Sequence, residues 1–275
     1  MMEKTNSTPR QNDDAFELRE KNQANDDVNQ YQLIGPGIIC DTEHRGYAMP
    51  GGQKQQSQGD NRVEIVLDSS EGFIPLWVKG TALHWRFQQR SLLRFKNPEA
   101  AKKRIKDLLG KALVAWGPAV PVKFTYDEDV WDFEIVVKQH DECNSQGCVL
   151  ASTFFPDGGQ HQFVIYPMMF TQSEADQVNT LKHEFGHIFG LRHFFAQISE
   201  TDAPSELFGK QNKFTIMNYG SNSKLTPADI KDLQHLYQLV WSGKLTKING
   251  TDIHLVKPFS AIPASVTSSL IFADA

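Results

Sequence analysis

Long apolar runs are missing from this chain of 275 residues. No stretch approaches the ~20 consecutive apolar residues that a membrane-spanning helix needs, so we expect no membrane as a partner. Blocks of basic residues are missing too, and the formal net charge of -5 argues against nucleic acid as a partner. The N-terminus lacks the apolar stretch of a secretory signal, which leaves two expected locations: outside the cell by another route, or the cytoplasm.

Large apolar side chains are scarce in the first 30 residues, where Asn, Gln, Asp and Glu dominate. Such a segment cannot bury enough surface to offset the entropy lost on ordering, so disorder is predicted there. Near the other end, Asn249-Gly250 predicts the tight turn of a hairpin. We therefore divide the chain into a disordered segment (1–30), an extension (31–75), a folded domain (76–240) and a C-terminal hairpin extension (241–275).

From about residue 76 the hydrophobic pattern becomes regular. Residues 81–87 alternate apolar with polar side chains, which predicts a half-buried strand. Asn97-Pro98 supplies an N-cap and a first-turn proline for a helix that Gly117-Pro118 ends. Further strands are expected at 122–126, 133–137, 149–155 and 162–166, and further helices at 173–189 and from 226 to about 240. Because strands crowd the first half of the domain and helices flank them, the fold class is predicted to be α+β.

Three of the nine histidines fall within eleven residues, at 183, 187 and 193. On the helix expected at 173–189, the apolar residues 178, 181, 185 and 188 share one arc that faces the core. His183 and His187 point roughly opposite that arc, and they lie side by side because residues four apart project from the same face of a helix. A lone histidine on a helix is usually an ordinary core or surface residue. A pair one turn apart, aimed away from the apolar stripe, predicts a chelating site for a metal.

Glu184 stands between the first two histidines, where it can hydrogen-bond a water molecule held by the metal. This H-E-x-x-H arrangement binds zinc through two imidazoles and uses the glutamate as general base. Gly190 predicts the end of the helix, so that the chain turns back and brings His193 to the metal as a third ligand. The full pattern, H-E-x-x-H-x-x-G-x-x-H, is the metzincin signature. Metzincins also carry a methionine turn beneath the zinc, and Met217 in "FTIMNYG" fits it.

From about Thr81 to Gln238 the chain resembles a metzincin metallopeptidase. In "CVLASTFFPDGG" and "LTPADIKDLQHLY" it resembles the matrixin (matrix metalloproteinase) catalytic domain. The resemblance implies a zincin-like, twisted five-stranded mixed sheet with an antiparallel edge strand and three main helices. It also implies one catalytic Zn²⁺ and an extended peptide bound by strand addition along Val149–Phe154. Tyr219 resembles the tyrosine of astacins and serralysins that contacts the zinc or the transition state, and it is a candidate oxyanion stabiliser.

The chain departs from the matrixin pattern where that family holds a second, structural zinc. Ser152 occupies the place of a matrixin histidine, which argues against that site in its usual form. His140, Asp141 and His161 lie nearby and are candidates for a poorer metal site. Candidate Ca²⁺ ligands, for which solvated surface charge is the commoner explanation, are Asp157, Glu174 and Asp176.

The three cysteines leave several interpretations open. Cys143 and Cys148 flank one loop and could form either a disulfide or a metal-binding pair. Cys40 lies upstream of the domain. A propeptide cysteine caps the zinc in latent matrixins, so the resemblance makes residues 31–75 a candidate propeptide-like segment. The sequence around Cys40 does not match the matrixin switch, however, and an ordinary buried or free thiol is the simpler interpretation.

These features predict a zinc endopeptidase that hydrolyses extended protein substrates with water and Glu184 as general base. No G-x-S-x-G motif is present, so nothing indicates a covalent nucleophile. Two alternatives remain: a non-catalytic zinc-binding scaffold, and a hydrolase of a non-protein amide. Retention of Glu184 argues against the scaffold, since zinc binding alone does not need it. We expect a monomer.

Overall fold

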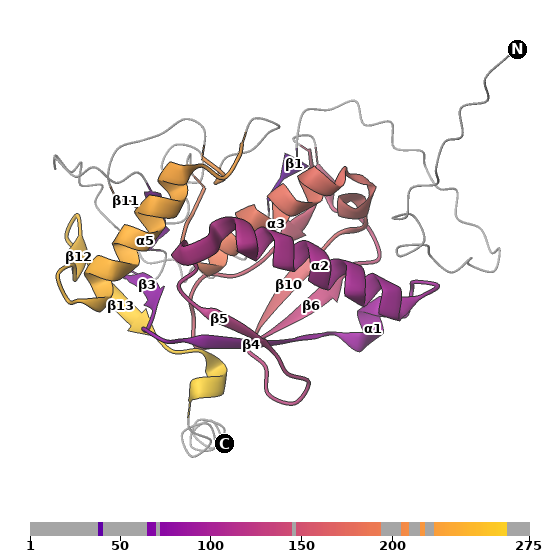
Figure 1. Cartoon of the computed structure of the whole chain (residues 1–275), viewed down its shortest axis with the longest axis horizontal. Coiled ribbons are helices and arrows are strands. Elements are labelled where there is room, and N and C mark those ends of the chain that lie inside the picture. The colour runs from indigo at the N-terminus through magenta and orange to yellow at the C-terminus, as the bar shows by residue number, and fades with distance from the viewer. Residues whose placement is uncertain are drawn as a thin grey trace, which may run out of the picture.

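The computed structural model describes residues 38–40, 65–69, 72–144, 147–193, 205–208, 215–217 and 223–262 (Figure 1). The segment predicted to be disordered, residues 1–30, lies outside the described residues. The other segment boundaries of the predicted division stay predictions.

A five-stranded sheet forms the centre of the fold, as predicted. Its order is β5 (Lys123–Tyr126), β4 (Ala82–Phe87), β6 (Phe133–Val137), β10 (His161–Ile165) and β9 (Ala151–Ser152). All neighbouring pairs are parallel except β9 with β10, so β9 is the antiparallel edge strand. Every second residue of β4 points toward the core: Leu83 and Phe87 are buried and Trp85 is half-buried.

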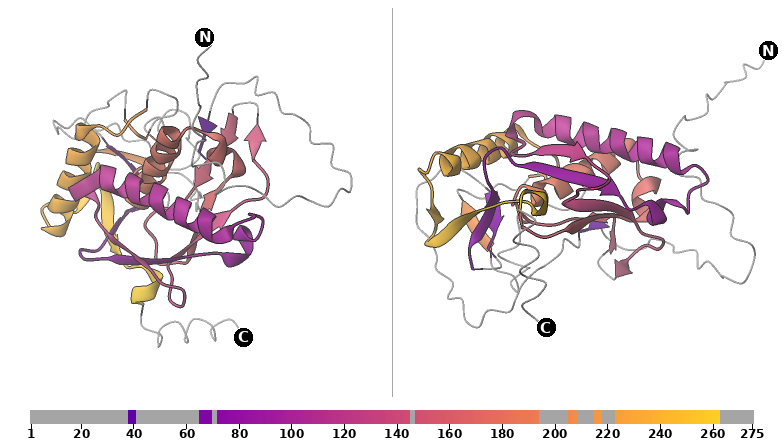
Figure 2. Two further views of the ribbon diagram at one scale, coloured as in Figure 1. Left: turned by 45° about the vertical axis from the view of Figure 1, so that its right-hand side comes forward. Right: turned by 90° about the horizontal axis from the view of Figure 1, so that it is seen from below.

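Three long helices accompany the sheet: α2 (Pro98–Trp116), α3 (Glu174–Ile188) and α5 (Pro227–Trp241); α1 (Gln89–Leu92) is a single turn. Each long helix begins with a side-chain cap, of which the one at Asn97 was predicted. The side chains of Asn97, Ser173 and Thr226 accept hydrogen bonds from the first-turn backbone, and Thr226 with Asp229 completes a capping box. Helix α2 lies along one side of the sheet and packs against α3 (Figure 2). The predicted α+β class, with three main helices, is confirmed.

Strands from both ends of the described chain add small sheets to this core. The predicted C-terminal hairpin is present: β12 (Lys247–Ile248) pairs antiparallel with β13 (Thr251–Val256) around Asn249 and Gly250, both at positive φ. Strand β13 also pairs in parallel with β3 (Ile74–Trp77), so the C-terminal hairpin packs on the domain. A two-stranded sheet joins β2 (Ile65–Asp68) to β11 (Ser205–Phe208).

A three-stranded sheet has the order β1 (Ile38–Ile39), β8 (Gly147–Val149), β7 (Cys143–Asn144). Cys143 and Cys148 face each other across β7 and β8 and form a disulfide, which decides between the two interpretations of this pair. Three short 3-10 helices complete the described elements: η2 (Gly117–Ala119), η3 (Pro167–Thr171) and η4 (Phe259–Ala261).

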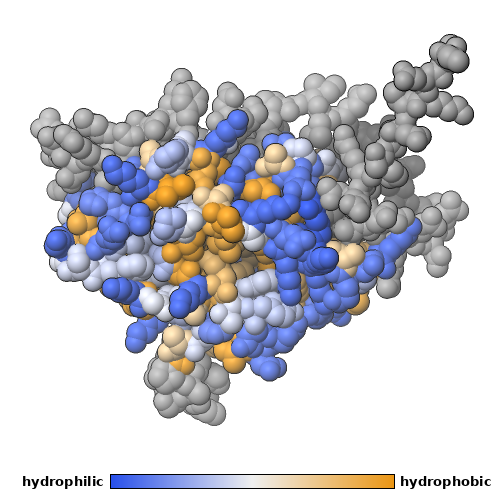
Figure 3. All heavy atoms as spheres, in the orientation of Figure 1, coloured by the Kyte–Doolittle hydropathy of each residue, from blue (hydrophilic) through white to orange (hydrophobic). Residues whose placement is uncertain are grey.

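The visible face in Figure 3 is mostly hydrophilic toward its two ends, with apolar residues gathered between them. None of the described helices combines the length with the apolar character that crossing a bilayer requires.

Candidate metal centre

The last six residues of α3, 183–188, are all buried. Leu181, Phe185 and Ile188 pack into the core as predicted. His183 and His187, expected on the opposite face, are buried as well, with exposed fractions of 7% and 1%. The sequence pattern does not predict this burial, because residues distant in the chain, such as Cys40 and Ile216, contact the two rings.

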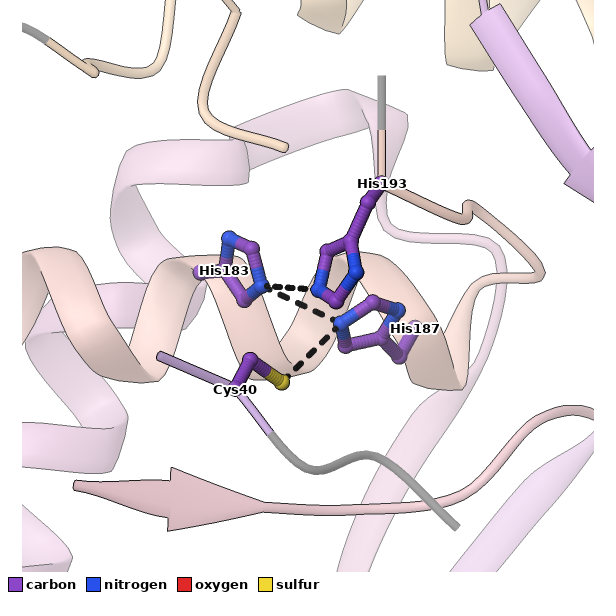
Figure 4. Close-up of side chains that lie close together, drawn as sticks. All are labelled: Cys40, His183, His187 and His193. Carbon is purple, nitrogen blue, oxygen red and sulfur yellow. Dashed lines mark hydrogen bonds between the residues drawn. The ribbon is translucent and has the colours of Figure 1, made fainter. Parts of the chain in front are cut away.

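The three predicted ligands meet at one point (Figure 4). The Nε2 atoms of His187 and His193 each lie 3.1 Å from Nε2 of His183. Two nitrogens bound to one tetrahedral zinc at ~2.0–2.1 Å would be roughly 3.3 Å apart, so the observed spacing fits a shared metal ion.

Backbone carbonyls fix the orientation of two of these rings. His183 Nδ1 lies 2.8 Å from the carbonyl oxygen of Ile216, and His187 Nδ1 lies 2.8 Å from that of Leu191. A carbonyl oxygen only accepts, so each Nδ1 must carry the proton and donate it. Both Nε2 atoms then present lone pairs to each other, an arrangement that a shared cation stabilises. Such outer hydrogen bonds are typical of metal-binding histidines.

A tight turn after α3 carries the chain from the second histidine to the third. Gly190 has φ +94°, a conformation that favours glycine. Its N–H donates to the His187 carbonyl, and the N–H of Leu191 donates to the Gly186 carbonyl, which together form a Schellman motif. This turn reverses the chain at the position predicted from the sequence and brings His193 back beside the helix.

Met217 lies directly against α3. A Cβ added at Gly186 would overlap the Met217 sulfur, so the glycine lets the methionine approach the helix backbone. The neighbouring residue, Ile216, supplies the carbonyl that accepts from His183. The turn predicted to carry Met217 therefore touches the metal centre. Tyr219, the predicted oxyanion stabiliser, lies outside the described residues.

Cys40 reaches this centre from the N-terminal extension, contrary to the simpler interpretation of it as an ordinary thiol. Its Sγ lies 3.5 Å from His187 Nε2 and 3.3 Å from Oε1 of Glu184. The sulfur and one nitrogen from each of the three histidines all lie within 4.8 Å of one another. Glu184 itself is buried, with 1% of its surface exposed.

The electrostatic environment favours uncharged imidazoles. Burial lowers the pKa of His187 well below its ordinary value, and the neighbouring His183 and His193 act in the same direction. Metal ligation requires the neutral ring, so this environment suits a metal ligand.

The weaker sites suggested by the sequence do not assemble in the described part of the chain. His140, Asp141 and His161 form no group there that could hold a metal. Asp141 accepts from the Met168 N–H, whereas the His161 ring stacks on Phe154 at 4.4 Å between centroids.

The candidate calcium ligands each have other partners. Glu174 pairs with Arg104 and Lys111, Asp176 accepts from Ser173, and Asp157 lies 3.6 Å from His161. Calcium binding stays an untested prediction.

Comparison with known proteins agrees with this geometry. The model of the matrixin peptidase family matches residues 76–238, more than half of the chain. The chain belongs to the matrixin family. In general terms this matrixin is therefore a zinc metallopeptidase that acts on peptides or proteins.

The other two comparisons add little. No curated protein matches this matrixin. Among solved structures, myroilysin is similar over 62% of this chain and 98% of its own, with 13% identity and a TM-score of 0.40, which is too low to support a functional inference.

Proposed function

We propose that this matrixin is an endopeptidase in which His183, His187 and His193 hold one catalytic Zn²⁺. The observation that carries the proposal is the meeting of three buried imidazoles whose Nε2 atoms converge beside Glu184. When bound, Zn²⁺ supplies Lewis acidity, polarising a carbonyl and lowering the pKa of water from 15.7 toward about 7.

Glu184 is the proposed general base. Its carboxylate lies one residue after His183 and within 3.3 Å of the Cys40 sulfur, so it faces the same small space as the three Nε2 atoms. There it would take a proton as water attacks the scissile carbonyl and then deliver that proton to the leaving amine. Tyr219 is proposed to stabilise the oxyanion.

The substrate is proposed to be an extended peptide. Strand β8 leads directly into the antiparallel edge strand β9, and its outer edge is able to accept a strand, since β1 pairs with it. A peptide that took the place of β1 at this edge would gain the same backbone hydrogen bonds.

We further propose that residues 38–40 keep the enzyme latent. The β1 strand pairs in parallel with β8, with Ile38 opposite Cys148 and Ile39 opposite Val149. The next residue, Cys40, places its sulfur against both Glu184 and His187. One short segment therefore covers the peptide-binding edge and the general base together, and a thiolate is a good zinc ligand.

A casein-digestion assay on the full chain carrying Cys40→Ala tests these proposals. We expect cleavage that a chelator abolishes and that exceeds the activity of the unmodified chain. Adding Glu184→Ala should leave one zinc per chain but lower turnover at least ~100-fold, the scale of a general base. Unchanged turnover in the Glu184 variant would refute its role.

The same assay separates the alternatives. Zinc binding without any cleavage would indicate the scaffold, and chelator-sensitive hydrolysis of small amides but not of casein would indicate a non-protein substrate. Equal activity of the unmodified chain and the Cys40→Ala variant would exclude latency through this residue.

A further inference from the structure

Two side chains that are not themselves metal ligands hold the C-terminal end of α3. Trp77 Nε1 donates to the carbonyl oxygen of Ile188 at 2.7 Å, and the Tyr237 hydroxyl donates to that of Phe189 at 3.1 Å. The last carbonyls of a helix have no partner inside it, so each of these bonds satisfies a group that would otherwise be buried and unpaired. Both side chains are almost completely buried, at 1% and 2% exposed.

These two carbonyls occupy a sensitive place in the sequence. Ile188 and Phe189 lie between His187 and the Gly190 turn, so they start the segment that carries His193 back to the cluster. Strand β3 packs tightly there as well, because a Cβ at Gly190 would lie 2.9 Å from Cδ2 of Leu76. The direction of the chain leaving α3 is therefore set by contacts with β3 and α5.

Strand β3 is in turn held from outside the matrixin-matched region. The N–H of Val78 donates to the carbonyl of Val256 at 3.1 Å, and β13 pairs with the whole of β3. Trp241 at the end of α5 makes a second contact with β3, since its Nε1 donates to the Trp77 carbonyl at 2.9 Å. The family match ends at residue 238, so both Trp241 and β13 lie beyond it.

We propose that Trp77 and Tyr237 are positioning residues of the metal centre, and that the C-terminal hairpin is the brace that holds Trp77 in place. By fixing the carbonyls of Ile188 and Phe189, they set the distance between His187 and His193. The hairpin, which would otherwise be a simple appendage, thereby contributes to metal affinity. This inference rests on the proposal that the three histidines bind zinc.

Zinc affinity of full-length variants tests the inference. Tyr237→Phe and Trp77→Phe each remove one donor and keep an aromatic ring. We expect each to weaken the zinc Kd, measured by competition with a chromogenic chelator, about tenfold, the lower end of the loss typical of outer-shell partners. Substituted Co²⁺ should report the same change as a shifted d–d absorption spectrum, which a purely structural role would not produce.

Ser91→Ala is the matched control. The Ser91 hydroxyl donates to the Gln88 carbonyl and accepts from the Val137 N–H, so its loss removes buried hydrogen bonds far from α3. This variant should lower Tm and leave the zinc Kd and the Co²⁺ spectrum unchanged. Tyr237→Phe loses only a hydroxyl and so keeps the test available even where Trp77→Phe does not fold.

The outcomes separate the two proposals. Failure of the unmodified chain to bind zinc would overturn the proposed function itself. Normal zinc binding by the unmodified chain, with the same Kd and Co²⁺ spectrum in Tyr237→Phe, would overturn the positioning role and leave the proposed function standing.

Discussion

The two ends of α3 are built in opposite ways. At its first turn, Ser173 caps the backbone and Glu174 forms ion pairs with Arg104 and Lys111 that stay partly exposed. At its last turn the helix is buried, and its last carbonyls accept hydrogen bonds from Trp77 and Tyr237, while the His183 ring donates to the Ile216 carbonyl. The exposed end tolerates change because solvent can replace a lost contact. The buried end carries the chemistry, and nothing there can replace a missing partner.

The largest expected effect is at the buried end. In the chain carrying Cys40→Ala, His187→Ala should reduce bound zinc from one per chain to none and abolish peptidase activity, because two imidazoles hold the metal poorly. Metal analysis after gel filtration measures this. His161→Ala is the control, since this histidine is also buried but stacks on Phe154. Normal zinc content in the His187 variant would remove this residue from the site.

The next effect concerns the turn that ends α3. Gly190→Ala should cost about 2 kcal/mol or more of unfolding free energy, because alanine is strained at positive φ and its Cβ meets Leu76. Gly243→Ala is the matched control, with φ +70° but open space around it. Chemical denaturation should show the larger loss at Gly190, and only that variant should also weaken zinc binding. Equal losses at the two glycines would mean that the contact with Leu76 is unimportant.

A smaller effect follows from the pKa of His187. That pKa is lowered in the folded state, so between the folded value and the ordinary value of about 6.5 the unfolded chain binds more protons. The resulting stability is fully present above about pH 6.5 and is lost as the pH falls. Thermal melts of the zinc-free protein should therefore show Tm falling from pH 7 to 5, with a shallower fall in His187→Gln. The same change at the exposed His235 should keep the original slope.

The smallest effect is expected at the exposed end. Glu174→Gln should cost less than about 1 kcal/mol, because partly exposed ion pairs contribute little. Lys111 and Arg104 lower the pKa of Glu174 to about 2, so this contribution is present above about pH 4.5 and fades as the pH approaches 2. Denaturation at pH 7 and pH 2.5 measures the difference. A loss as large as that at Gly190 would erase the contrast between the two ends.

Local signals made much of this structure predictable. Each of the caps at Asn97, Ser173 and Thr226 involves only residues within about four positions of one another, and the Gly190 turn is similarly local. The five-stranded sheet with an antiparallel edge strand followed from the family resemblance, and the order of its strands was not predicted, since pairing partners are far apart in the chain. The histidine spacing predicted the cluster because a helix places residues four apart on one face.

What could not be predicted depends on contacts between distant segments. Nothing in the sequence around Cys40 indicates that it reaches Glu184, because that approach depends on the pairing of β1 with β8. The hydrogen bonds from Trp77 and Tyr237 were missed for the same reason. A tryptophan at the end of an apolar strand usually signals only a core position, and its indole N–H acquires a role only when a helix end arrives beside it.

The pairing of β3 with β13 has a consequence for folding during synthesis of the enzyme. These strands lie near opposite ends of the described chain, and pairings between such distant residues form late because a long loop must close first. A ribosome releases β13 only after α3 and all three histidines have emerged. A growing chain would thus carry its zinc-binding residues without the support that aligns them until β13 has also emerged, which delays the appearance of a competent protease.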